Sequence, residues 1–114
     1  MLDMKEKNLV FGIINHCKRI EETLNKKTKI DFDKNQDIRD IVCFNILQIG
    51  ELAKNLSPSF ISKYDNVPWR EIKGMRDWVA HGYGTIDFDT IWKTAVEDIM
   101  HLKEYCEFIL NNDK

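Results

Sequence analysis

Three side chains that could act on a phosphodiester lie close together in the segment 75–83. These are Arg76, His81 and Tyr83. Arginine carries a permanent planar positive charge that suits phosphate, and histidine is the side chain best suited to moving protons near neutral pH. Arg76 and His81 together form a minimal set for chemistry at phosphorus. The hydroxyl of Tyr83 adds a group that can be modified.

If the substrate is RNA, cleavage by the neighbouring 2′-hydroxyl needs a base for that proton and an acid for the leaving 5′-oxygen. It also needs positive charge near the phosphorus. His81 can serve as base or acid, and Arg76 can hold the phosphate through a bidentate contact. This scheme needs no metal and no other cofactor. One histidine does not easily fill both roles at once, whereas a symmetric homodimer would supply a second.

Helix geometry separates these side chains on paper. On an ideal helix Arg76 and His81 point about 140° apart, and Tyr83 returns close to the direction of Arg76. We expect Gly82 to end the helix, so that the backbone can turn beside His81. Asp77 has three interpretations that the sequence leaves open: it orients the guanidinium, it polarises His81, or it is a solvated helix residue.

The elements that position this segment are helices. Apolar residues recur every three or four positions in segments 3–25, 33–56, 68–81 and from 87 onward, which is typical of amphipathic helices. Ser57-Pro58 predicts the start of a short helix that runs to about Tyr64. We expect Asp33 and Asp87 to cap the helices that follow them. The pattern predicts one all-α domain, residues 1–114, built as an up-down bundle of four main helices plus a short one.

Composition narrows the functional classes. The net charge of −2 argues against a protein that coats nucleic acid through a broad basic face, although a small basic pocket remains compatible with it. Apolar runs are too short for a membrane span, and the first residues are too polar for a signal peptide. We therefore expect a cytoplasmic protein without membrane contact. Cys17, Cys43 and Cys106 are widely spaced, which predicts reduced packing residues.

Several other polar and aromatic residues are candidates either for a supporting role in the site or for packing. Asn45, Gln48 and Glu51 recur at helical spacing, and Asn45 and Glu51 are candidates to support the site from a neighbouring helix, unless they form a solvated flank. We expect His16 and His101 to be surface or boundary residues. For Trp69, Trp78 and Trp92, packing in the core or in a dimer interface is favoured over base stacking.

Several linked motifs resemble the HepT-like branch of the HEPN superfamily. They are the stretch 44–57 (FNILQIGELAKNLS), the stretch 67–77 (VPWREIKGMRD) followed by His81-Gly82-Tyr83, and Ile86-Asp87 followed by Ile91-Trp92. The resemblance covers essentially the whole chain, in the family's order and spacing. It implies an all-helical, dimeric endoribonuclease that acts without metal, as the toxin of a type VII-like toxin–antitoxin pair.

The resemblance also implies roles for individual residues. The family pattern Arg-x4-His-x-Tyr is complete here, so Arg76 and His81 would be catalytic. Tyr83 would be the position to which an antitoxin, a minimal nucleotidyltransferase of the MntA type, transfers AMP from ATP. That adduct would add negative charge and bulk beside the site and so block RNA.

One position departs from the family pattern. Asp77 stands where asparagine is common, and an ionised aspartate cannot donate a hydrogen bond. Its charge opposes phosphate binding and would raise the pKa of a neighbouring histidine. This residue supports an alternative function, a non-catalytic helical partner subunit of a nucleotidyltransferase. A third hypothesis, a nucleic-acid-binding regulator, is disfavoured by the acidic net charge.

Overall fold

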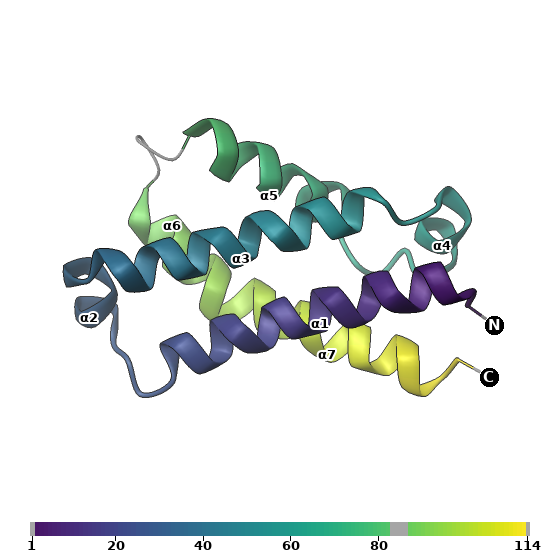
Figure 1. Cartoon of the computed structure of the whole chain (residues 1–114), viewed down its shortest axis with the longest axis horizontal. Coiled ribbons are helices and arrows are strands. Elements are labelled where there is room, and N and C mark those ends of the chain that lie inside the picture. The colour runs from purple at the N-terminus through teal and green to yellow at the C-terminus, as the bar shows by residue number, and fades with distance from the viewer. Residues whose placement is uncertain (1, 83–86, 114) are drawn as a thin grey trace.

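The computed structural model describes residues 2–82 and 87–113, except for the side chain of Trp78. Within that part of the chain most residues are helical and no strand is present. Four long helical runs alternate in direction along the molecule (Figure 1). They are α1 (Met4–Leu24), α3 (Gln36–Lys54), α5 (Trp69–Gly82) and a last run of α6 (Phe88–Lys93), η2 (Thr94–Asp98) and α7 (Ile99–Asn111). The predicted all-α up-down bundle is therefore confirmed.

Short polar side chains start three of these helices. Asp3, Ser57 and Asp87 each accept a hydrogen bond from a backbone N–H in the first turn of α1, of α4 (Pro58–Lys63) and of α6. Such caps satisfy N–H groups that have no partner within the helix. Pro58 follows Ser57 in the first turn, where its missing N–H costs nothing. The starts predicted at Ser57 and Asp87 are confirmed.

The start predicted for the second long helix is wrong. Residues 29–34 form a separate short helix, α2 (Lys29–Lys34), and α3 begins only at Gln36. Thr28 opens α2 through a capping box with Asp31, in which each side chain accepts from the other residue's backbone N–H. Asn35 then takes extended backbone angles and caps α3 itself. Asp33, the expected cap, lies inside α2 and pairs with Lys29 at 2.7 Å.

The last helical run contains one turn of π-helix. Residues Thr94–Asp98 form η2 between α6 and α7, in a stretch predicted as regular α-helix. A π-turn widens the helix by one residue and is frequent at functional sites. Thr94 and Ala95 in this turn are buried, whereas Asp98 is exposed. The turn therefore shifts which residues of the run face the rest of the bundle.

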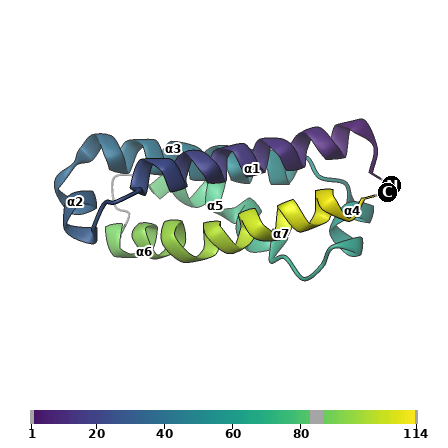
Figure 2. The same ribbon diagram turned by 90° about the horizontal axis from the view of Figure 1, so that it is seen from below.

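The apolar stripes meet in one core. Helix α1 packs against α3 on one side and α7 on the other, and α5 packs against the far side of α3 (Figure 2). Cys17, Cys43 and Cys106 are buried there as free thiols. Trp69 is also buried, and its indole N–H donates to the carbonyl of Tyr64. The packing roles predicted for these residues agree with their positions.

Helix α2 ties α6 to the rest of the bundle. The guanidinium of Arg39, near the start of α3, lies 4.5 Å from the centre of the Phe88 ring. It also donates to the carbonyl oxygens of Phe32 and Asp33 at the end of α2. Lys29 bridges from α2 to Asp89 of α6 at 2.5 Å. These contacts fix the first turn of α6, directly after the segment that joins it to α5.

The two ends of the described chain meet at one end of the molecule. The backbone N–H of Leu2 donates to the Asp113 carboxylate at 2.7 Å, and Lys7 lies 3.5 Å from the same carboxylate. The molecule measures 44 × 29 × 20 Å, and α2 and the start of α6 lie at the opposite end of its long axis (Figure 1). None of the helices described is long and apolar enough to cross a membrane.

Candidate functional site

Arg76 lies on the face of α5 that packs against α3. A Cβ atom built on Gly50 would lie 2.7 Å from the Arg76 Cβ and 2.8 Å from the Arg76 backbone nitrogen. Only a residue without a side chain fits at this distance. Gly50 therefore lets the two helix backbones approach each other at the arginine. The Arg76 side chain extends beyond this helix contact and is 35% exposed.

Two carboxylates hold the guanidinium of Arg76. The Nε of Arg76 contacts Oε1 of Glu51 on α3, and Nη1 donates to Oδ1 of Asp77 at 2.8 Å. The hydrogen bond to Asp77, together with the charge of Glu51, raises the pKa of Arg76. The structure thus brings together three residues that the sequence indicated separately. Of the three interpretations of Asp77, it places this side chain against the guanidinium.

Asp77 also lies next to His81. The two residues are four positions apart on α5, so their side chains are neighbours on one face of the helix. The bond from Arg76 lowers the pKa of Asp77, and the charges of His81 and Lys54 act in the same direction. Arg76 and His81 point about 140° apart on an ideal helix, and Asp77 lies between them. His81 itself is exposed in the last turn of α5, whose described residues run to Gly82. Because residues 83–86 lie outside the described part of the chain, the helix end predicted at Gly82 stays a prediction.

Two residues predicted for the site are not found beside Arg76. Asn45 lies in another part of the bundle, and Tyr83 lies outside the described residues. Tyr83 falls in residues 83–86, which lie outside the part of the chain described here. Asn45 is buried in the contact between α1 and α3, six residues and about 120° around α3 from Glu51. Its amide donates to the Ile41 carbonyl at 2.8 Å and accepts from Nδ1 of His16 at 2.7 Å. These contacts give Asn45 a packing role. The helical spacing of Asn45, Gln48 and Glu51 in the sequence did not distinguish this role from that of Glu51.

The importance of Gly50 and the pairing of His16 with Asn45 were not anticipated. A glycine inside the apolar pattern of a helix is a signal for close backbone approach, so Gly50 could have been found. The partner of His16 could not have been found, because it lies 29 residues away on another helix.

Comparison with known proteins assigns the family. The family model described as "Ribonuclease HepT-like" matches residues 13–109. A bundle of this kind, with an arginine and a histidine on one helix, is the architecture that this resemblance implied. The chain belongs to the ribonuclease HepT-like family.

Individual relatives agree with this assignment. "Putative RNase TTE0752" of Caldanaerobacter subterraneus subsp. tengcongensis is 32% identical over 102 residues, covering 90% of this chain and 91% of that protein. "Gamma-glutamylcyclotransferase and putative RNase MJ0434" of Methanocaldococcus jannaschii is 37% identical over 92 residues, and the match spans only 41% of that longer protein. "Probable ribonuclease HepT" of Thermococcus cleftensis is 44% identical over 55 residues, about half of each chain. No solved structure matches the chain.

Proposed function

We propose that this protein is a metal-independent endoribonuclease in which Arg76 binds the scissile phosphate and His81 transfers protons. The observation that carries the proposal is the partly exposed Arg76 guanidinium, held at Nε by Glu51 and at Nη1 by Asp77, the helix neighbour of His81, in a chain of the ribonuclease HepT-like family. Glu51 anchors Nε from the neighbouring helix. The outer edge of the guanidinium, Nη1 and Nη2, then faces a phosphate and can form a bidentate contact once Asp77 is displaced.

The reaction follows from these groups. A base takes the proton of the 2′-hydroxyl, whose oxygen attacks phosphorus and forms a 2′,3′-cyclic phosphate. The bond from phosphorus to the 5′-oxygen breaks, and an acid protonates that oxygen. Arg76 stabilises the negative charge that develops on the phosphoryl oxygens. His81 of one subunit acts as base or acid, and His81 of a second copy fills the other role.

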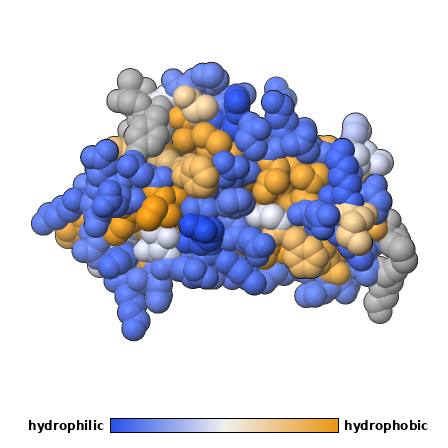
Figure 3. Space-filling view, in the orientation of Figure 1, coloured by the Kyte–Doolittle hydropathy of each residue, from blue (hydrophilic) through white to orange (hydrophobic). Residues whose placement is uncertain are grey.

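A homodimer would bring the two sites together, and the surface of α3 supports this proposal. Phe44 is 55% exposed and Ile41 is 41% exposed. Phe44 precedes Glu51 by seven residues, so both lie on nearly the same face of α3. An exposed phenylalanine two turns from the carboxylate that holds Arg76 is a natural contact for a second copy. Figure 3 shows hydrophobic patches over α3 and α1 on the face turned toward the viewer.

We further propose that the protein is the toxin of a toxin–antitoxin pair, silenced by transfer of AMP to Tyr83. The transfer joins the Tyr83 oxygen to the α-phosphorus of ATP and releases pyrophosphate. The adduct adds a negative charge two residues after His81 and competes with RNA for the guanidinium. An MntA-type minimal nucleotidyltransferase is the proposed antitoxin.

The test of the ribonuclease is direct. Purified protein is incubated with single-stranded RNA in EDTA and compared with Arg76→Ala, His81→Ala and, as a matched control, Arg70→Ala. Arg70 is an exposed arginine on the same helix, six residues before Arg76. We expect cleavage by the wild type and Arg70→Ala, and at least a 100-fold loss in the other two, in keeping with the usual size of an acid–base contribution. Equal cleavage by all four proteins would refute the assignment.

The modification needs its own test. The chain is co-expressed with an MntA-type minimal nucleotidyltransferase, and the intact mass is compared with that of a Tyr83→Phe variant. We expect additions of AMP units in the wild type alone. The same additions in Tyr83→Phe would place the modified residue elsewhere.

A second candidate function has a specific observation in its favour. Asp77 contacts Nη1 of Arg76, so a carboxylate occupies part of the guanidinium edge that a phosphate needs. This favours a non-catalytic partner subunit of a nucleotidyltransferase. A stable complex with an MntA-type nucleotidyltransferase, combined with no RNA cleavage by wild type or by Asp77→Asn, would select this function over the ribonuclease.

A further inference from the structure

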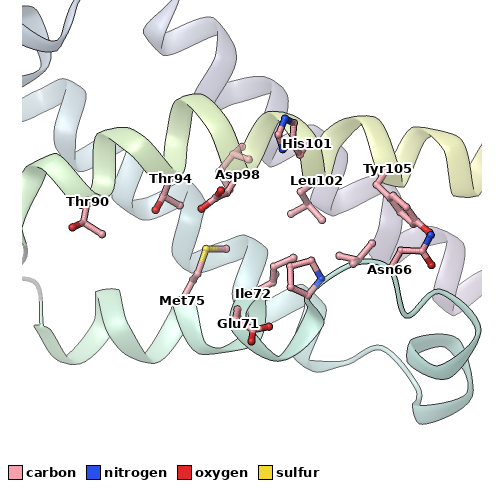
Figure 4. A pocket seen from close by; sticks show the side chains of 13 residues that line it. Asn66, Glu71, Ile72, Met75, Thr90, Thr94, Asp98, His101, Leu102 and Tyr105 are labelled. Atoms are coloured by element: carbon pink, nitrogen blue, oxygen red, sulfur yellow. The ribbon is translucent and has the colours of Figure 1, made fainter.

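The side of α5 that faces away from α3 borders a groove. Helix α5 packs closely on α3 but makes few contacts with η2 and α7. The space between them is a hollow of about 470 Å³ that opens to the surface. Figure 4 shows α5 along one side of this hollow and the run from α6 to α7 along the other. Among the residues described, no side chain fills it.

The groove is apolar and elongated. Its apolar lining comes from the two residues before α5, from α5 and from α7. These residues are Val67, Pro68, Ile72, Met75, Ile99 and Leu102. A second, smaller hollow shares Asn66, His101 and Tyr105 with the first and continues to Phe108, which is exposed. From Thr90 to Phe108 the helical run extends for about 27 Å at 1.5 Å per residue. This length matches a helix of about four to five turns rather than a compact small molecule.

The charged residues of the groove are acidic. Glu71 of α5 and Asp98 of η2 line the larger hollow, and Glu104 of α7 lines the smaller one. In the described part of the chain, no ion pair joins any of the three to a cation. An RNA strand would meet repulsion here. A segment with lysine or arginine beside an apolar stripe would find both kinds of complementary surface.

We propose that this groove binds an amphipathic helix of a partner protein, with an apolar stripe flanked by basic residues. The apolar stripe would cover Met75 and Leu102, and its basic flanks would pair with Glu71 and Asp98. Around α5, Met75 lies about 160° from Asp77 and about 120° from His81, so the bound helix would occupy a different side of α5 from both. The groove is therefore a separate site, and its occupant does not compete with RNA for Arg76.

The experiment uses a fluorescein-labelled 18-residue peptide of leucine and lysine, patterned as an amphipathic helix, and measures anisotropy with the full chain at physiological salt. A peptide of the same pattern with glutamate in place of lysine is the peptide control. The variant Glu71→Lys with Asp98→Lys tests the groove. Glu22→Lys with Asp37→Lys, at exposed positions on α1 and α3, makes the same change in net charge elsewhere.

We expect the groove variant to lose at least tenfold in affinity for the lysine peptide and the distant variant to stay within twofold of wild type. The glutamate peptide should bind at least tenfold more weakly. Equal losses in the two double variants, or equal binding of the two peptides, would overturn the proposal. If the groove variant fails to fold, as judged by its circular dichroism melt, Met75→Gln replaces it with the same criteria.

Self-association is the remaining outcome. If gel filtration shows a dimer that only the groove variant dissolves, a second copy occupies the groove and the proposal of a basic partner is overturned. No RNA is present in any of these measurements, so their result is independent of the ribonuclease assignment.

Discussion

Gly50 on α3 and Arg76 on α5 touch backbone to backbone, closely enough that a methyl group on Gly50 would lie within 2.8 Å of the Arg76 nitrogen. Such a distance is shorter than a Cβ atom tolerates, and the atom it meets belongs to a helix backbone that cannot rotate away. The position of the candidate phosphate-binding arginine therefore depends on the absence of a side chain one helix away.

Gly50→Ala should push α5 away from α3. We expect a net loss of about 1–3 kcal/mol in the free energy of unfolding, the usual cost of forcing extra volume into a packed contact. Urea denaturation followed by circular dichroism measures this loss. RNA cleavage should fall as well, because Arg76 moves relative to Glu51.

Gly74→Ala is the matched control for that change. Gly74 lies in the same helix as Arg76, and nothing lies within 4 Å of a Cβ built there. We expect this variant to gain about 0.5–1 kcal/mol, since alanine has the higher helix propensity. If Gly50→Ala were as stable as Gly74→Ala, the close approach of the two helices would not be important for the fold.

Asp77→Asn should strengthen phosphate binding by Arg76. Asp77 is 69% exposed, so its removal should leave folding stability almost unchanged. The competing negative charge at Nη1 disappears, and because the contribution of such an exposed ion pair is small, we expect a rise in kcat/KM of no more than about fivefold. Steady-state cleavage of a short RNA measures it.

Glu51→Gln should act in the opposite direction, because Glu51 anchors Nε from α3 and leaves the outer edge of the guanidinium available. We expect this variant to cleave more slowly than wild type at unchanged fold. Equal rates for Asp77→Asn and Glu51→Gln would show that the two carboxylates do not have the distinct roles assigned here.

Phe44→Glu should prevent dimerisation if α3 forms the interface. A charge placed at this exposed position would be buried without a partner in the dimer. Light scattering after gel filtration should then give a monomer, and cleavage should be lost with the second His81. The control is Ile30→Glu on α2, where the side chain is 63% exposed and distant from Glu51 in the sequence. A dimeric Phe44→Glu protein would place the interface on another surface.

The three thiols should make the protein sensitive to alkali. Burial, with the charge of Asp40, raises the pKa of Cys43 to about 11, and burial raises the pKa of Cys106 to about 12, against 9.0 for a free thiol. Burial raises the pKa of Cys17 further still. Because the folded thiols stay protonated while those of the unfolded chain ionise, their contribution to stability is complete below pH 9. It is lost as the pH rises from about 9 through 11 and 12.

Urea midpoints at pH 7.5, 9 and 10 check this expectation, with Cys43→Ala as the comparison, since its midpoint should fall less steeply. At pH 8 the native thiols should also resist iodoacetamide, as read by intact mass, and react only after denaturation. Rapid labelling of native protein would contradict the buried positions of the three cysteines.

Much of the fold could be predicted because its signals are local. The caps at Ser57 and Asp87 and the apolar stripes of the long helices indicate where each helix lies. The residue types of the Thr28–Asp31 capping box are also present in the sequence. The apolar pattern nevertheless predicted a single helix that starts at Asp33. The π-turn at Thr94–Asp98 has no comparable local signal, because it depends on how this helical run packs against the other helices.

The candidate site was predictable in its residues but not in its geometry. Spacing alone separated Arg76 from His81 by about 140°, and the way Asp77 lies between them follows only when the Arg76 side chain is seen folded back toward it. Glu51 and Asn45 looked equivalent in the sequence. Their roles differ because one faces α5 and the other faces α1, and that distinction depends on which helices pack together.

The meeting of Leu2 with Asp113 at one end of the molecule has a practical and an architectural consequence. A fusion partner, an affinity tag or a surface anchor attached at either terminus emerges from the same pole, far from α2 and the start of α6 (Figure 1). The same closeness makes the chain suited to circular permutation, with the old ends joined by a short linker and new ends opened between α1 and α2, where residues 25–28 are exposed at the opposite end of the molecule (Figure 1). Such a permutant would place a reporter at a second pole without altering any residue of the bundle's interior.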